Sequence, residues 1–356
     1  MIVMIGTARG GAGGVASVIA TYAAHGLFQR WPVVTLDSHV VANKWRKFAT
    51  FLRALLQFVG LLIRGRVTLV HLHTSAGPSF WRKTCFALLA FALRKPVILH
   101  VHSGLFMAFY EQDCGLLRRR IVRFIFEHSA RVIALTPSWR TQYLTIAPRA
   151  NIVCIPNTVI LKGGGTRSAP GRNILFLGQI SAAKGVFDLL EAWPQVLRRV
   201  SGTRLIIAGD GEVARAQQAM NDLGITASVE LPGWVSGAAK QALLEKTGIN
   251  VLPSYFEGMP MGLLEAFALG IPCVASNVGG IPDMLTDGAE GRLVQAGDVA
   301  ALAAAIINVL SNGEQYARMS RAACARFAHD YSADVVMPKL ERLYAELGAT
   351  ALARVA

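Results

Sequence analysis

Residues 248–283, GINVLPSYFEGMPMGLLEAFALGIPCVASNVGGIPD, decide the fold class of this 356-residue chain. The apolar run Ile249–Pro253 predicts a strand that is buried on both faces. A turn follows it, then a helix whose first position we assign to Pro260, and then a second apolar strand near 272–276. Strand, helix and strand in this order are typical of an α/β protein with a parallel sheet.

Two acids, Glu257 and Glu265, lie eight residues apart in this stretch. Glu257 follows the first strand, and Glu265 lies in the second turn of the helix between leucines, an alanine and a phenylalanine. The alternative of a surface turn with a solvated glutamate is the weaker one, because an acid in so apolar a segment is costly unless it is paired or functional. Both acids are predicted at the carboxyl edge of the sheet, where α/β proteins bind ligands, and the helix start suits an anionic ligand.

The composition favours an enzyme that meets a membrane. Hydrophobic residues make up 53% of the chain and charged residues 16%, and the mean hydropathy is +0.41, which excludes a disordered protein. The five cysteines are scattered without a C-x-x-C pair, so we expect a reducing cytosol and neither a disulfide framework nor a cysteine zinc site. The longest apolar runs, 54–63 and 85–93, are shorter than the about 18 residues of a membrane span, and no signal peptide is visible.

The whole chain alternates between predicted strands and helices. Residues 162–171, KGGGTRSAPG, form a glycine-rich linker near its middle. We therefore expect two Rossmann-like, doubly wound α/β domains facing a central cleft, 1–160 and 161–331, with a last helix at about 332–347 packing back on the first. The predicted strands lie near 2–5, 33–36, 68–72, 97–101, 132–136, 152–155, 173–177, 204–208, 229–231, 249–253, 272–276 and 291–294.

A glycine loop, Gly10–Gly14, separates the first strand from a helix at 15–24. It contains G-x-G-x-x-A, and Asp37 ends the second strand, as in a dinucleotide-binding fingerprint. Three interpretations stay open for this loop: NAD binding, contact with a donor phosphate, and a tight turn that only glycine allows.

Two His-x-His pairs end neighbouring strands, His71 with His73 and His100 with His102. Strand alternation places both members of a pair on one face. Zinc is conceivable, but no Cys, Asp or Glu is grouped with the pairs, so we expect no metal. His102, which Ser103 follows, is the best placed to reach a ligand.

Further loops at strand ends carry candidate groups. Lys184 lies in the loop GQISAAKG, 178–185, where its charge suits a diphosphate, although an exposed structural lysine is the alternative. The loops 209–212 and 232–235 end two other strands and share the same sheet edge. Because no D-x-D occurs, we expect Lys184 and helix N-termini, rather than a metal ion, to neutralise the diphosphate.

Basic charge is concentrated in the first half. Residues 1–165 carry 20 Lys and Arg but 4 Asp and Glu, a net charge of +16, whereas residues 166–356 carry a net charge of −2. The segments 44–66 and 116–131 mix basic with Leu and Phe residues at helical spacing, which predicts helices lying on anionic lipid. Core helices with solvated arginines are the alternative, and no nucleic-acid-binding motif is present.

Together these motifs resemble glycosyltransferase family 4, retaining nucleotide-sugar-dependent enzymes of the GT-B fold, over nearly the whole chain. The most specific part is Glu257-x7-Glu265 with NVGGIPD after it. The resemblance implies that Glu257 holds hydroxyls of the donor sugar and that Glu265 binds the ribose. It implies that the sugar and phosphate are lined by the backbone of Gly258, Met259, Pro260 and Met261.

The resemblance also implies that Lys184 pairs with the diphosphate and that Gly233 and Val235 contact the base. The family commonly has Gly-Arg where this chain has Gly178-Gln179. One diphosphate cation is therefore missing, and the loss of a charge-assisted contact costs about 1.5–3 kcal/mol.

In the first half, the resemblance implies that His102 lies near the reacting sugar carbon and that Gly13 and Gly14 close over the phosphate and acceptor. The first half then takes the acceptor and the second half the nucleotide sugar. The resemblance implies that the sugar keeps its anomeric configuration. Because the sequence offers no obvious nucleophile–base pair, we expect front-face attack assisted by the leaving diphosphate.

We therefore expect a hexosyltransferase that uses a UDP- or GDP-sugar and no other cofactor. A lipid-linked saccharide of polysaccharide, exopolysaccharide or lipopolysaccharide synthesis is the expected acceptor. The expected location is the cytoplasm, peripheral on the inner face of the cell membrane. The alternatives are a catalytically silent membrane-associated GT-B scaffold and an NAD-dependent oxidoreductase.

Overall fold

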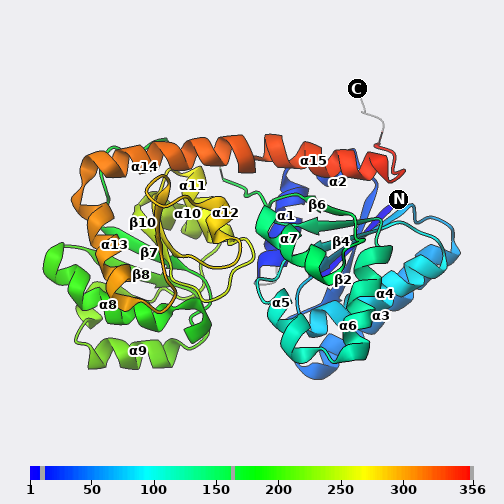
Figure 1. Ribbon diagram of the computed structural model, residues 1–356, viewed down its shortest axis with the longest axis horizontal. Coiled ribbons are helices and arrows are strands. Elements are labelled where there is room, and N and C mark those ends of the chain that lie inside the picture. Colours follow the sequence, from blue (N-terminus) through cyan, green and yellow to red (C-terminus); the bar gives the residue numbers. More distant parts are fainter. Residues whose placement is uncertain (9–12, 162–164, 353–356) are drawn as a thin grey trace. The chain divides into compact units, whose positions relative to one another are not determined.

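The computed structural model describes residues 1–8, 13–161 and 165–352. Gly10, Gly11 and Ala12 of the glycine loop and residues 162–164 of the predicted linker lie outside these residues. The chain divides into two compact units, Met1–Ile160 with Ala333–Ala356, and Leu161–Ser332 (Figure 1). Each unit is an α/β structure built on one six-stranded parallel sheet, as predicted.

The first sheet has the strand order β2-β1-β3-β4-β5-β6. Its strands are β1 (Ile2–Thr7), β2 (Val33–His39), β3 (Leu69–Thr74), β4 (Val97–Val101), β5 (Arg131–Ala134) and β6 (Ile152–Cys154). The helices of this unit are α1 (Gly14–Ala24), α2 (Leu27–Arg30), α3 (Lys44–Ile63), α4 (Pro78–Ala92), α5 (Phe106–Ala108), η1 (Phe109–Asp113), α6 (Leu116–His128), α7 (Pro137–Ile146) and α15 (Ala333–Glu346).

Right-handed crossovers place α3, α4, α6 and α7 on one face of this sheet and α1 on the other. The first face packs on one core that contains Phe58 of α3, Phe86 of α4 and Phe126 of α6. In Figure 1, α3, α4 and α6 lie side by side, and α4 contacts both of its neighbours.

The second sheet has the order β12-β11-β10-β7-β8-β9. Its strands are β7 (Asn173–Leu177), β8 (Arg204–Ala208), β9 (Val229–Glu230), β10 (Thr247–Leu252), β11 (Cys273–Ser276) and β12 (Gly291–Val294). Its helices are η2 (Ala182–Lys184), α8 (Val186–Arg199), α9 (Val213–Asp222), η3 (Thr226–Ser228), α10 (Gly237–Glu245), α11 (Met261–Ala268), α12 (Ile281–Met284), α13 (Val299–Ser311), α14 (Gly313–Arg326) and η4 (Phe327–Tyr331).

The last helix, α15, belongs to the first unit although it follows the second in the chain. Glu341 of α15 forms an ion pair with Arg30 (2.6 Å), and Glu346 forms one with Arg131 (3.6 Å). The hydroxyl of Tyr344 lies 2.8 Å from Nδ1 of His71 in β3. The helix therefore covers the face of the first sheet that carries the histidines.

One boundary in the 248–283 stretch differs from the prediction. The helix starts at Met261, and Pro260 is its N-cap, because the ψ of Pro260 is 124°, which is extended and not helical. Among the described residues, no helix has the length and apolar character needed to cross a membrane.

Candidate active site

The first predicted acid, Glu257, lies in the loop between β10 and α11 and is 7% exposed. Its Oε1 accepts hydrogen bonds from Nζ of Lys184 (2.7 Å) and from the hydroxyl of Ser254 (2.8 Å). Lys184 ends η2, in the loop after the neighbouring strand β7, so two loops meet at the carboxyl edge of the second sheet. Lys184 and Glu257, both predicted for the donor site, are therefore in direct contact. Ser254 was not predicted.

Two glycines allow the close approach of these loops. Gly185 follows Lys184 with a φ of 67°, and a Cβ on it would lie 1.9 Å from the carbonyl oxygen of Pro253. Gly279 has a φ of 55°, and a Cβ there would lie 1.9 Å from the carbonyl oxygen of Glu257. The same carbonyl accepts a hydrogen bond from the N–H of Gly280 (3.2 Å). Glu257 is therefore held through its backbone as well as its carboxylate.

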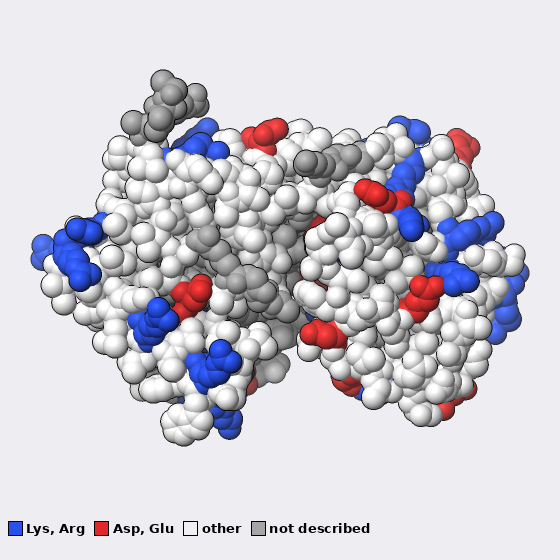
Figure 2. Space-filling view, turned by 180° about the vertical axis from the view of Figure 1, so that it is seen from behind, with Lys and Arg blue, Asp and Glu red and all other residues white. Residues whose placement is uncertain are grey.

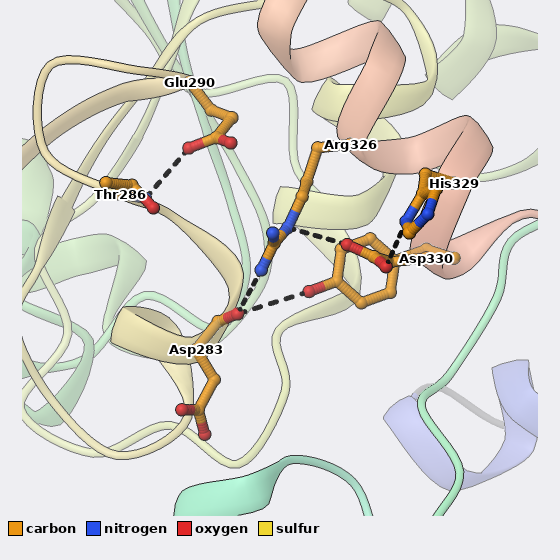
Figure 3. A network of polar contacts seen from close by, with 7 residues as sticks. Asp283, Thr286, Glu290, Arg326, His329 and Asp330 are labelled. Atoms are coloured by element: carbon orange, nitrogen blue, oxygen red, sulfur yellow. Dashed lines mark hydrogen bonds and ion pairs between the residues drawn. The ribbon is translucent and has the colours of Figure 1, made fainter.

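A polar network holds α12, the helix that follows the Gly279–Gly280 turn (Figure 3). The carbonyl of Asp283, in α12, accepts hydrogen bonds from the guanidinium of Arg326 (2.8 Å) and from the hydroxyl of Tyr331 (3.5 Å). Nε of Arg326 also pairs with the carboxylate of Asp330 at 3.0 Å. The network ties α12 to α14 and η4, and it thereby anchors the Gly279–Gly280 turn.

The second acid, Glu265, is 8% exposed in α11, and its Oε1 lies 2.5 Å from Nζ of Lys240 in α10. Burial raises the pKa of Glu265, and the charge and hydrogen bond of Lys240 act in the opposite direction. The sequence indicated that this acid needs a partner or a function but did not identify Lys240. The signal was available, because Lys240 opens the helix after the predicted base-binding loop.

The other predicted donor-site residues also lie at the carboxyl edge of the second sheet. Gln179 is exposed in the loop after β7, and Gly233 and Val235 lie in the loop between β9 and α10. The N-cap Pro260 has no side-chain hydrogen bond to offer the first N–H groups of α11, which suits an anionic ligand. The predicted sugar-lining backbone leads into this helix start at Gly258, Met259, Pro260 and Met261.

In the first unit, the four predicted histidines form one buried array on β3 and the end of β4. Nε2 of His71 lies 3.3 Å from Nδ1 of His100, and Nδ1 of His73 lies 2.9 Å from Nε2 of His102. The two members of each His-x-His pair lie on one face, as predicted, and the contacts between the pairs show that both pairs share that face. His71, His73 and His100 are at most 1% exposed, and His102 is half-buried at the carboxyl edge.

These imidazoles are neutral at physiological pH. Burial lowers the pKa of His71 to about 3, and it holds the pKa values of His73 and His100 well below their usual range. Burial and the nearby charge of Lys83 lower the pKa of His102 as well. His102 thus offers a ligand a neutral imidazole that donates or accepts a hydrogen bond.

Ring nitrogens of His71, His73 and His100 lie within 4.8 Å of one another, close enough to be considered as metal ligands. Three of the hydrogen bonds in the array already use such nitrogens: His71 with Tyr344, His71 with His100, and His73 with His102. Nε2 of His73 and Nε2 of His100 are buried without a hydrogen-bond partner among the described residues. A metal-free site stays our prediction.

Gly13 and Gly14 begin α1 at the carboxyl edge of the first sheet. A Cβ on either glycine would have no described heavy atom within 4 Å, so packing against described residues does not require glycine at either position. Gly13 has a φ of 134°, which favours glycine. The free space that the described residues leave beside these glycines suits the close approach of a ligand.

Family models match both halves of the chain. Residues 12–162 match the model described as Glycosyltransferase Family 4, and residues 166–326 match Glycosyl transferases group 1. A phosphatidyl-myo-inositol mannosyltransferase of Mycobacterium leprae is 29% identical over 80% of this chain and 74% of its own length. A glycogen synthase of Mycobacterium tuberculosis is 32% identical over 50% of this chain, but the match spans only 43% of that protein.

Solved structures share the fold at low identity. Sucrose-phosphate synthase from Thermosynechococcus elongatus has a TM-score of 0.76 and 19% identity, over 97% of this chain and 98% of that one. HepE of Anabaena, solved in complex with UDP, has a TM-score of 0.76 and 17% identity, over 97% and 99% of the two chains. The two parallel sheets, the paired acids and the family matches in both halves agree: this chain belongs to the family 4 glycosyltransferases of the GT-B fold.

Proposed function

We propose that this protein is a retaining hexosyltransferase that moves a sugar from a UDP- or GDP-sugar to a lipid-linked saccharide. The observation that carries the donor assignment is the meeting of Glu257 and Lys184 at the carboxyl edge of the second sheet. Glu265 lies in α11, the helix that follows the loop of Glu257. In this arrangement Glu257 can bind sugar hydroxyls, Lys184 the diphosphate and Glu265 the ribose.

The proposed chemistry needs no protein nucleophile. The bond between the anomeric carbon and the diphosphate oxygen breaks, and the acceptor hydroxyl forms the new bond on the same face of the sugar. Its proton passes to the departing phosphate oxygen. Lys184 and the N–H groups at the start of α11 stabilise the charge that develops on the leaving group. By the family resemblance, Glu257 and neutral His102 orient the donor sugar.

A lipid acceptor is supported by the exposed face of α3. Apolar side chains of α3, spaced three, four and seven residues apart, are exposed to solvent. They lie opposite the face of α3 that packs on the core through Phe58. Trp45 and Ile63 at its ends are 83% and 79% exposed. Exposed apolar stripes of this length mark interaction surfaces. The stripe consists of Trp45, Phe48, Leu52, Leu56 and Ile63.

Basic side chains accompany this stripe. The first turn of α3 carries Lys44, Arg46 and Lys47, and Figure 2 shows many Lys and Arg groups but few acidic groups on the first unit, at the left. A cationic helix with an exposed apolar face suits an anionic lipid surface. The relative from Mycobacterium leprae is named for a lipid acceptor, phosphatidyl-myo-inositol. We place the protein on the cytoplasmic face of the cell membrane, in the synthesis of exopolysaccharide, lipopolysaccharide or another polysaccharide.

The donor is tested by thermal stabilisation and hydrolysis with a panel of UDP- and GDP-sugars. We expect one nucleotide sugar to stabilise the protein and Glu257→Gln to abolish transfer while the fold remains. Glu290→Gln is the matched control, because Glu290 is 6% exposed but bonds the N–H of Thr286 instead of Lys184. A product anomer opposite to that of the donor, read by NMR, refutes retention.

The membrane surface is tested by flotation with anionic vesicles. We expect binding at low ionic strength that weakens with salt and is lost in the double variant Trp45→Asp, Leu56→Asp. Failure to float at low salt refutes the membrane proposal and leaves the donor proposal intact.

A catalytically silent scaffold remains the second candidate, since Gln179 stands where the family commonly has an arginine. Calorimetry with the same nucleotide sugars separates the two functions: the scaffold binds none of them.

A further inference from the structure

An apolar cavity of about 400 Å³ lies between α4 and α6 on the outer surface of the first unit. Its volume falls in the range of about 300–1,000 Å³ that is usual for ligand sites. Two of its apolar side chains, Leu88 and Phe124, are 46% and 41% exposed. The cavity is lined by Trp81, Thr84, Leu88, Arg120, Ile121 and Phe124.

The ends of this groove differ in charge. Helices that follow the strands of a parallel sheet begin at its carboxyl edge, so the N-terminal turns of α4 and α6 mark the end nearest His102. Arg118 lies over the ring of Trp81 at that end, 5.9 Å from its centroid, and Arg120 follows on the lining. The other end, at Phe124, is closed by rings, because Phe124 stacks on His128 at 3.9 Å and contacts Phe91 edge-on at 6.2 Å.

An apolar groove that is lined by Arg120 and flanked by Arg118 suits a hydrocarbon chain that carries a phosphate. We propose that the groove between α4 and α6 binds the chain of a phosphate-linked lipid, with the phosphate beside Arg118 and Arg120. That this lipid is the acceptor rests on the function proposed above. In this orientation the head group of the lipid points toward the sheet edge that carries His102, and its hydrocarbon chain lies along α4 and α6.

Dodecyl phosphate, below its critical micelle concentration, is the probe for calorimetry on the full chain. We expect one molecule to bind per chain, and inorganic phosphate at the same concentration to give no binding. Leu88→Asp places a charge in the groove at an exposed position and should weaken binding at least tenfold. Arg120→Gln should weaken binding about three- to tenfold, since it removes a charge-assisted contact.

The matched control is Leu352→Asp, an equally drastic change at a leucine that is as exposed as Leu88 (47% and 46%) and that lines neither the groove nor the α3 stripe. It should leave the affinity for dodecyl phosphate unchanged. Wild-type affinity in Leu88→Asp, or equal weakening in both variants, overturns the proposal. A concentration-dependent dimer that Leu88→Asp abolishes, without dodecyl phosphate binding, also overturns it and assigns the groove to a second copy. Nucleotide-sugar binding, measured in the same variants, reports separately on the proposed function.

Discussion

Nδ1 of His73 lies 2.9 Å from Nε2 of His102, so a fully buried imidazole holds the ring at the carboxyl edge of the first sheet. The hydrogen bond occupies one nitrogen of His102 and fixes the orientation of the other. His73 is therefore a positioning residue for His102.

We expect His73→Phe to lower kcat about three- to tenfold with little change in the donor KM, because a hydrogen bond contributes about 0.5–1.5 kcal/mol. His73→Asn, whose amide nitrogen replaces Nδ1, should restore most of the rate. Tyr22→Phe is the control, since Tyr22 packs on His73 but its hydroxyl has no hydrogen-bond partner among the described residues. Equal losses in Phe and Asn variants contradict a positioning role.

Single substitutions should weaken or strengthen the contact that we propose between Lys184 and the donor diphosphate. Lys184→Met should raise the donor KM about ten- to a hundredfold, because a charge-assisted contact is lost. Gln179→Arg should lower the donor Kd about tenfold by restoring the second cation. Gln217→Arg, on the exposed face of α9, controls for the added charge. An unchanged Kd in Gln179→Arg shows that this loop does not reach the diphosphate.

The ion pair of Glu265 with Lys240 predicts a pH dependence. Burial raises the pKa of Glu265, and Lys240 partly offsets that effect. Ribose binding by an ionised Glu265 should therefore weaken as the pH falls, at a higher pH than for an ordinary glutamate. Lys240→Met should move this rise in donor KM to still higher pH, whereas Lys246→Met, an exposed change nearby, should not. Measuring the donor KM of the wild type and both variants between pH 5 and 8 tests these expectations.

The buried imidazoles predict acid sensitivity of the fold. The folded pKa values of His71, His73 and His100 lie below that of an unfolded histidine, about 6.5. The unfolded chain binds more protons below that pH, so the free energy of unfolding falls by up to about 1.4 kcal/mol per group and pH unit. Thermal unfolding from pH 7 to 5 should show a steep fall in Tm. His100→Phe should reduce the fall in Tm between pH 7 and 5. His128→Gln, which changes an exposed histidine of α6, should leave that fall unchanged.

We expect chelation to leave transfer unchanged, because in the proposed site Lys184 and the N-terminus of α11, rather than a metal ion, neutralise the diphosphate. Dialysis against EDTA with metal analysis before and after provides the test. Loss of activity that zinc restores would instead assign an ion to the histidine array.

The fold was predictable from the sequence because strands of a parallel sheet are buried on both faces. Their continuous apolar runs, such as Ile249–Pro253, are visible without any tertiary information, and glycines such as Gly279 mark the turns. The predicted strand runs correspond to strands of the two sheets, with ends that differ by a few residues.

The sequence suggests residues for the candidate site but does not identify the partners of those residues. Lys184 with Glu257 spans 73 residues, and Lys240 with Glu265 joins two helices, so neither pairing follows from local periodicity. The bond between His73 and His102 depends on the register of β3 with β4, which sets His73 opposite His100. Pairing across a sheet is a property of the assembled structure and cannot be read from one strand.

The return of α15 makes the second unit an insertion within the first. Tyr344, the partner of His71, follows it by 273 residues, so during synthesis the first sheet is made long before the helix that covers its histidine face. The histidine face of the first sheet therefore lacks the cover of α15 until the second unit has been synthesised. The first unit can therefore be completed only after the whole second unit has been synthesised.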